Sequence, residues 1–183
     1  MSCICFKGGS KGRDGRFRSL FLLALMSALA SGCKEMNLSE GGIMGAPAPD
    51  FSLRDLSGQT KRFSDWRGKA VLLDFWAAWC GSCRESVPAY ERIYQRFHEK
   101  NLVVLGIDED AEPGIAATSA RKWGISYPVL LDPRGRVFDA YGARTMPAVF
   151  LIDSSGTMRG RWEGFDASIA DEIQKAVRAM AEP

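Results

Sequence analysis

The chain has 183 residues, of which 46% are apolar and 25% are charged, with a net charge of +2. This is the composition of an ordinary globular protein, and the length favours a single domain. Five of the 24 basic residues but only one of the 22 acidic residues lie within the first 32 positions, so the rest of the chain carries no basic surface that would indicate nucleic-acid binding.

The first 32 residues have the pattern of a lipoprotein signal peptide. A basic segment precedes the apolar run LFLLALMSALA, residues 20–30, which is short for a membrane span but suits a signal-peptide core. The run ends in LASGC, and small residues before Cys33 are typical of a signal in which that cysteine receives lipid. We therefore expect an exported lipoprotein of the cell membrane or outer membrane, facing the periplasm. A simple cleaved signal and an uncleaved anchor are the alternatives, and both would also export the domain.

Residues 33–45 are polar and contain glycine, which predicts a flexible tether from the lipidated Cys33. The folded domain is then expected to occupy residues 46–183. It should open with a hairpin made of Phe51–Leu53 and Lys61–Phe63, followed by a helical turn at the sequence SDW.

The stretch VLLDFWAAWCGSC, residues 71–83, joins a predicted strand to two cysteines. Ala70–Phe75 is apolar except for Asp74, which is typical of a central strand buried on both faces. Apolar residues at helical spacing follow Cys83, namely Val87, Tyr90, Ile93, Tyr94 and Phe97. Cys80 and Cys83 are therefore expected where the strand turns into a helix.

This position predicts a redox-active pair. The unpaired N–H groups and the dipole of a helix N-terminus favour an anion, so the thiol of Cys80 should ionise more easily than a free thiol. The spacer Gly81 and Ser82 lets Cys83 form a disulfide with Cys80, and the pair needs no other cofactor. We predict that Cys80 attacks a substrate disulfide and that Cys83 resolves the mixed disulfide.

Asp74 is the predicted proton acceptor for Cys83. It is the sole charged residue of the predicted buried strand, and a desolvated carboxyl has a raised pKa suited to proton transfer. The alternative is that Asp74 faces water or pairs with a lysine such as Lys69. Trp76 and Trp79 are expected either to shield the sulfurs and shape a docking surface or to belong to the core.

A metal site is disfavoured by the cysteine and histidine count. Zinc bound by a CxxC pair needs two further ligands, and after Cys83 the chain offers no cysteine and only His98, which we expect on an exposed helical face. A purely structural disulfide is also disfavoured, because closing so short a loop removes little entropy from the unfolded chain.

The chain beyond the first helix predicts further alternation of strands and helices. Leu102–Asp108 is a buried strand, Ile115–Trp123 is a helix opening at Pro113, Pro128–Leu131 is a short edge or insert strand, and Val137–Tyr141 is a short helix. The strand, helix, strand order requires a parallel pair joined by a right-handed crossover.

In the final third, TMPAVFLID places Pro147 directly before an apolar strand, and GTMRGRWEG supplies an antiparallel partner after a turn at residues 153–156. An amphipathic helix follows, with Ile169, Ile173, Val177 and Met180 on its apolar face.

The segments DFWAAWCGSC and TMPAVFLID together resemble those of the membrane-anchored TlpA/ResA-like branch of thioredoxin-fold oxidoreductases, over about residues 46–180. The resemblance implies a thioredoxin-like α/β fold, with a mixed central sheet flanked by helices and an N-terminal β-hairpin extension. It gives Asp74 the role of proton acceptor. It also implies that the Met146–Pro147 bond is cis and faces the cysteines, whereas a plain trans loop is the expectation for Pro alone. The expected substrate-binding residues are Trp79, Gly81, Ser82, Met146 and Pro147.

Two positions depart from that branch. Ser82 stands where Pro is usual, which leaves the reduction potential open. In CRESVP, Glu85 lies one place early and Ser86 takes the familiar acidic position, so the family's acid/base role does not carry over to Glu85.

The resemblance favours a reductant of protein thiols, such as the haem-site cysteines of apocytochrome c or those of a copper-binding partner. Outside the cytosol, the pair would need a membrane protein that donates electrons through thiols. We expect a monomer that is held to the membrane by its lipid.

Two other functions are weighed against this one. A peroxidase of the peroxiredoxin group shares the fold and the hairpin, but its nucleophile is expected in a PxxxTxxC setting, which LLDFWAAWC lacks. A non-enzymatic chaperone or copper-handling lipoprotein would use the two cysteines, with Met146 nearby, as ligands of a cuprous ion.

Overall fold

The computed structural model describes residues 43–181. The predicted signal peptide, Cys33 and most of the predicted tether lie outside the described residues. Within the part that is described, no helix is long and apolar enough to cross a membrane.

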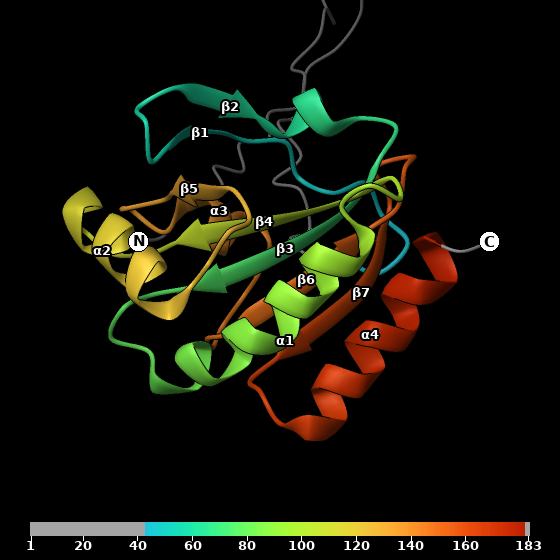
Figure 1. Ribbon diagram of the computed structural model, residues 1–183. Coiled ribbons are helices and arrows are strands. Elements are labelled where there is room, and N and C mark those ends of the chain that lie inside the picture. The colour runs from blue at the N-terminus through green and yellow to red at the C-terminus, as the bar shows by residue number, and fades with distance from the viewer. Residues whose placement is uncertain (1–42, 182–183) are drawn as a thin grey trace, which may run out of the picture. The chain divides into compact units, whose positions relative to one another are not determined.

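A mixed sheet organises the described residues around strand β3 (Ala70–Trp76), whose seven residues are all buried. The strand order is β2-β1-β5-β4-β3-β6-β7 (Figure 1). β3 runs parallel to β4 and antiparallel to β6, so the predicted mixed sheet is confirmed. The other strands are β1 (Ser52–Asp55), β2 (Thr60–Arg62), β4 (Leu102–Asp108), β5 (Val129–Leu131), β6 (Ala148–Ile152) and β7 (Met158–Glu163).

The predicted N-terminal hairpin is confirmed, and its first strand pairs with β5. β1 pairs antiparallel with β2 and, through Arg54 and Asp55, with β5. β5 also pairs parallel with β4, so it lies inside the sheet and β2 forms the edge. Of the two predicted places, an edge or an insert strand, β5 therefore takes the inserted one, and the run PVLL alone could not decide between them because the distant hairpin covers this strand.

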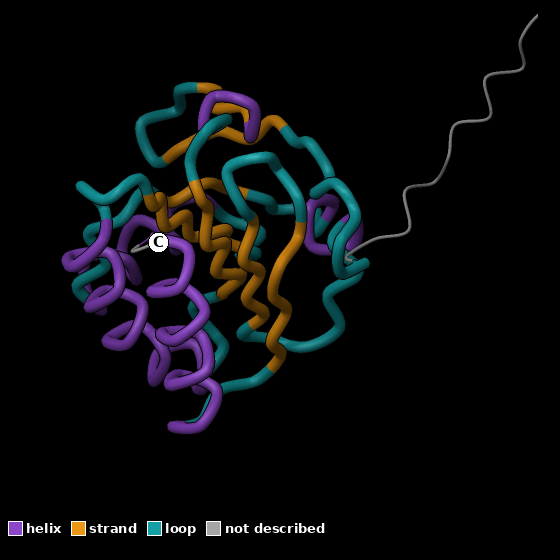
Figure 2. The backbone as a smooth tube through the Cα atoms, turned by 90° about the vertical axis from the view of Figure 1, so that its right-hand side faces the viewer, coloured by secondary structure: helices purple, strands orange, loops and turns teal. Residues whose placement is uncertain are grey.

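Helices cover both faces of the sheet, as Figure 2 shows in the turned view. α1 (Gly81–Phe97) and α4 (Ala167–Ala181) lie on one face, and α3 (Arg136–Ala140) packs on the other. The remaining helical elements are α2 (Pro113–Trp123) and the short 3₁₀ helix η1 (Phe63–Trp66), which is the predicted helical turn.

The alternation of side chains along β3 divides the core into two layers. Leu72 packs with Tyr90 of α1 and Ile173 of α4 in one buried cluster. Phe75 packs with the rings of Phe138, Tyr141 and Phe150 in the other. Burying each such side chain contributes roughly 1.5–3 kcal/mol, so the two layers hold β3 firmly in place. By the same alternation Asp74 points to the α1 face.

Candidate active site

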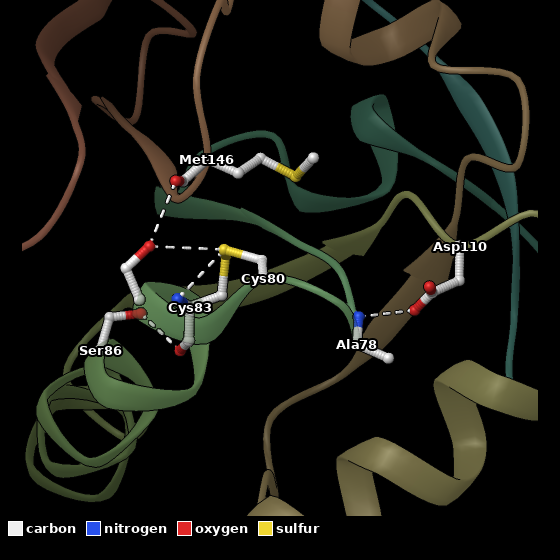
Figure 3. Close-up of a disulfide and its surroundings, with 7 residues drawn as sticks. Ala78, Cys80, Cys83, Ser86, Asp110 and Met146 are labelled. Atoms are coloured by element: carbon white, nitrogen blue, oxygen red, sulfur yellow. Dashed lines mark hydrogen bonds between the residues drawn. A yellow bond between two sulfur atoms is a disulfide. The ribbon is translucent and has the colours of Figure 1, made fainter.

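The two cysteines form a disulfide at the junction between β3 and α1 (Figure 3). Cys80 is the N-cap residue of α1, and its sulfur accepts a hydrogen bond from the backbone N–H of Cys83 at 3.1 Å. A sulfur at this point receives a backbone donor and the positive end of the helix dipole, both of which stabilise a thiolate. The predicted position at a helix start is therefore confirmed.

The two sulfurs lie at different depths. Cys80 is 6% exposed, whereas Cys83 is fully buried. The buried Ser86, which stands at the acidic position of the resembling family, donates its hydroxyl to the carbonyl of Cys83 at 2.9 Å. Glu85, one residue before it, is exposed on the surface of α1.

On the outer side of the disulfide, Ser82 lies between the sulfur and a distant loop. Its hydroxyl lies 3.6 Å from the sulfur of Cys80 and donates to the backbone carbonyl of Met146 at 3.4 Å. Gly81 is exposed, with open space around it, and Trp79 is exposed over 69% of its surface. These groups form the surface beside Cys80 that a partner protein would meet first.

The loop before β6 completes this outer side. The Met146–Pro147 peptide bond is cis, which confirms what the resemblance implied. Pro147 is buried, and its carbonyl accepts from the N–H of Gly164 at 2.8 Å, which ties the loop to the end of β7. Among residues 43–181 the backbone N–H of Met146 has no hydrogen-bond partner. This N–H can therefore pair with another extended chain.

Asp74 lies in the core on the α1 face, and it is fully buried. Burial raises the pKa of its carboxyl to about 7, against a smaller opposite effect from the hydroxyl of Tyr127, which donates to Oδ2 at 2.9 Å. Oδ1 has no partner among the described residues. The alternative in which Asp74 faces water or pairs with Lys69 is therefore wrong.

The two tryptophans differ in their surroundings. Trp76 is fully buried, packs against Trp123 of α2 at 5.2 Å between ring centroids, and belongs to the cluster that contains both cysteines. A Cβ on Gly106 would come within 2.9 Å of the Trp76 ring nitrogen and 3.1 Å of the Tyr127 ring, so this position has to be glycine. Trp76 is part of the buried cluster around the cysteines, whereas Trp79 belongs to the outer surface.

The sequence interpretation missed the groups that hold the loop before Cys80. Asp110 is buried, and its carboxylate accepts the backbone N–H of Ala78 at 2.8 Å (Figure 3). Its own N–H donates to Asp108, whose pKa is raised to about 8 by burial and by the neighbouring Asp110. The signal was present in the run Asp108, Glu109 and Asp110, because polar side chains at the end of a strand parallel to β3 lie beside the end of β3 itself.

Residues 43–181 contain no group of three or more histidine, cysteine, aspartate or glutamate side chains placed to hold a metal ion. His98 lies just after α1, with Nδ1 2.9 Å from the carbonyl of Tyr94 and its ring tilted against the Tyr94 ring. It is well removed along α1 from the cysteines and takes no part in their surroundings.

Comparison with known proteins gives a consistent set of similarities. Residues 44–161 match the AhpC/TSA family. The chain is 32% identical over 145 residues to the thiol-disulfide oxidoreductase ResA of Geobacillus thermodenitrificans, which covers 78% of this chain and 83% of that protein. It is 35% identical over 130 residues to the thioredoxin-like protein YneN of Bacillus subtilis, covering 69% and 72%.

Solved structures agree with these relatives. A thiol:disulfide interchange protein, DsbE, from Chlorobium tepidum has a TM-score of 0.74 and 32% identity, covering 77% of this chain and 99% of that one. The exposed lipoprotein thioredoxin Etrx1 of Streptococcus pneumoniae has a TM-score of 0.59 and 33% identity, covering 72% and 99%. The described fold is thus thioredoxin-like, as the sequence motifs implied.

Proposed function

Because the chain belongs to the AhpC/TSA family of thioredoxin-fold proteins and is a thiol-disulfide oxidoreductase, we propose that it works as an exported, membrane-tethered reductant of protein disulfides through Cys80 and Cys83. One observation carries the proposal: the outer sulfur of a disulfide caps a helix directly beside a loop whose Met146 N–H is unpaired among the described residues. This arrangement presents a stabilised nucleophile and a strand-like docking edge at the same place.

Cys80 performs the first step in the reduced protein. Its thiolate attacks one sulfur of a substrate disulfide and forms a mixed disulfide, while the other substrate sulfur leaves as a thiolate. The N–H of Cys83, which points at this sulfur at 3.1 Å, stabilises the negative charge before the attack. The substrate chain docks along Trp79, Gly81, Ser82, Met146 and Pro147.

Cys83 performs the second step and depends on a proton acceptor. It is fully buried, and among the described residues the hydroxyl of Ser86 donates to its backbone carbonyl and no group donates to its sulfur, so nothing in the outer site stabilises its thiolate. Asp74, with a pKa near 7, is ionised in part at neutral pH and accepts the proton. The thiolate of Cys83 then attacks Cys80, and the substrate departs with both its sulfurs reduced.

The proposed direction and partners rest on the relatives and on redox chemistry. After each turnover the pair is a disulfide, and outside the cytosol it has to be reduced again by a membrane protein that donates electrons through thiols. Suitable substrates are proteins whose cysteines must stay reduced to bind a cofactor, such as apocytochrome c or a copper-binding protein. The pair Cys80–Cys83 carries the two electrons without another cofactor.

The proposed anchor is lipid on Cys33. LASGC at the end of the apolar leader motivates it, and the relative Etrx1 is named as an exposed lipoprotein. Replacing Cys33 by alanine should move the protein from membranes to the soluble exported fraction with its redox activity unchanged. Mass spectrometry that finds an unmodified Cys33 in membrane-bound protein would contradict this anchor.

The central experiment measures insulin disulfide reduction and the Cys80–Cys83 potential against glutathione. A dedicated reductant should reduce insulin and have a potential near that of thioredoxin, about −270 mV, rather than that of the oxidant DsbA, about −120 mV. Consumption of hydrogen peroxide in the same preparation would favour a peroxidase. Stoichiometric cuprous ion on the reduced protein without insulin reduction would favour a copper-handling protein. Either result would overturn the proposal.

A further inference from the structure

Ser82 is one of the two positions at which this chain departs from the family that it resembles. Among the described residues, it is also the side chain whose hydrogen bonds join the sulfur of Cys80 to the loop before β6. Its hydroxyl oxygen lies 3.6 Å from the sulfur of Cys80 and 3.4 Å from the carbonyl oxygen of Met146. A proline at this position would have neither a hydroxyl nor a backbone N–H. The two contacts therefore belong to this chain's own sequence.

A serine hydroxyl carries one proton, so it can make one strong donated hydrogen bond at a time. In the disulfide form the sulfur of Cys80 is neutral, and the carbonyl of Met146 is the better acceptor. Reduction by a dithiol breaks the S–S bond, leaves an electron pair on the sulfur of Cys80, adds one of the dithiol's two protons to Cys83, gives the other proton to solvent and releases the donor as a disulfide. The sulfur is then an anion, and hydrogen bonds to an ionised acceptor are about twice as strong as those between neutral groups.

We propose, on the basis of the function given above, that Ser82 is a redox-responsive positioning residue: its hydroxyl donates to the Met146 carbonyl in the disulfide form and to the Cys80 thiolate in the reduced form. Reduction thereby frees the Met146 carbonyl beside a Met146 N–H that already lacks a partner among the described residues. Both backbone groups of Met146 then face an incoming extended chain. Both backbone groups of Met146 are thus free in the reduced form, which binds a disulfide substrate. In the disulfide form, from which the product leaves, Ser82 again donates to the Met146 carbonyl.

The first test is a titration of the Cys80 thiolate by its ultraviolet absorbance, in full-length protein reduced with dithiothreitol. The Ser82→Ala variant should raise the Cys80 pKa by about one, because the thiolate loses a charge-assisted hydrogen bond. At a pH where the Cys80 thiolate is formed, the equilibrium between the Cys80–Cys83 pair of this variant and glutathione should move about tenfold toward the Cys80–Cys83 disulfide. This corresponds to a change of about 30 mV in the reduction potential.

Three matched variants separate the hydroxyl from general effects. Ser82→Thr keeps the hydroxyl and should retain the wild-type pKa, whereas Ser82→Pro should behave like Ser82→Ala, because proline is tolerated in the first turn of a helix. Ser154→Ala makes the same atomic change on the exposed turn at the opposite end of β6 and should change nothing. A Ser82→Ala thiolate that titrates with the wild-type pKa would overturn the proposal.

The second test follows the Met146 carbonyl itself. Met146–Pro147 is the one Met-Pro sequence in the chain, so labelling methionine with ¹³C at the carbonyl and proline with ¹⁵N marks this single peptide group for NMR. The carbonyl resonance should shift on reduction in the wild-type protein and move much less in Ser82→Ala. Equal shifts in the two proteins would overturn the switch at the docking loop.

These readouts also distinguish the two proposals. Failure of wild-type protein to reduce insulin would overturn the proposed function, whereas the titration and the carbonyl shift require only chemical reduction of the disulfide. Active protein with no effect of Ser82→Ala on either readout would overturn the inference about Ser82 alone.

Discussion

The two sides of the Cys80–Cys83 disulfide are built from opposite chemistry. On the outer side, the N–H of Cys83 donates to the sulfur of Cys80, the hydroxyl of Ser82 lies 3.6 Å from the same sulfur, and the ring of Trp79 is exposed. On the inner side, Cys83 is fully buried, and the buried carboxyl of Asp74 lies on the face of β3 that α1 covers. Donors stabilise a thiolate, whereas a carboxylate accepts the proton that makes one.

This contrast explains how two identical side chains three residues apart can take different roles. In the proposed mechanism, the fixed dipoles around Cys80 stabilise its thiolate before the attack, whereas Cys83 stays a neutral thiol until a base removes its proton. The two cysteines are chemically identical, so their different roles come from their surroundings: the N-terminus of α1 for Cys80 and the buried layer between α1 and β3 for Cys83.

Removing the outer sulfur should have the largest effect. Cys80→Ser should abolish insulin reduction, because the donors of the outer side then surround a hydroxyl that is a far weaker nucleophile. Turbidity of reduced insulin is the measurement. Substantial activity in Cys80→Ser would mean that the buried Cys83 is able to attack alone, which the inner side should prevent.

Removing the inner base should come next. Asp74→Asn should slow resolution of the mixed disulfide by about 10²–10⁴-fold near neutral pH, the usual worth of general-base catalysis, and leave the first attack unchanged. The difference should shrink as pH rises past the thiol's own pKa, because hydroxide then removes the proton. Stopped-flow measurement of both steps from pH 6 to 10 tests this. Equal resolution rates in the two proteins would leave Asp74 a structural residue.

The carboxyl of Asp74 should also make the free energy of unfolding depend on pH. Because its folded pKa is raised from 3.8 to about 7, the native protein keeps a proton that the unfolded chain has lost, so stability falls as pH rises from about 4 to about 7. The Asp74→Asn variant does not show this fall in stability, because its amide does not titrate. Urea unfolding should show the variant gaining of the order of 4 kcal/mol on the wild type across that range, with no further gain above it. A pH-independent difference would contradict the buried, titrating carboxyl.

A smaller effect should follow when the hydroxyl beside Asp74 is removed. Tyr127→Phe deletes the donor to Oδ2 and should raise the Asp74 pKa further, which moves the pH dependence of resolution upward by about one pH unit. Tyr141→Phe is the matched control, because its hydroxyl donates to Pro49 and its ring packs on the other face of the sheet. A Tyr127→Phe profile that coincides with that of the control would show that the hydroxyl does not tune Asp74.

The parts of this account that depend on local pattern could be predicted from the sequence. The apolar run of β3, the helical spacing after Cys83 and the hairpin before the domain are properties of adjacent residues, and the structure confirms them. The burial of Asp74 could also be predicted. All the other residues of this strand are apolar, so both faces of the strand are buried and the one charged side chain has no exposed face to occupy.

Contacts between distant parts of the chain could not be predicted in this way. Asp110 bonds Ala78 across 32 residues, Tyr127 bonds Asp74 across 53, and Ser82 contacts Met146 across 64. Each depends on the order of strands in the sheet, and the choice between an edge and an insert position for β5 stayed open for the same reason. The resemblance to a known branch placed the Met146–Pro147 loop opposite the cysteines, but at Ser82 the branch has proline and offered no guide.

The most direct test of the two-sided site is to trap the mixed disulfide. Cys83→Ser and Cys80→Ser proteins are each reduced, incubated with a disulfide-containing peptide and examined by mass spectrometry without reductant. The account predicts a peptide adduct on Cys80 in the Cys83→Ser protein and almost none in the Cys80→Ser protein. An adduct that accumulates on Cys83 while Cys80 stays free would contradict it, because the inner sulfur would then be the attacker.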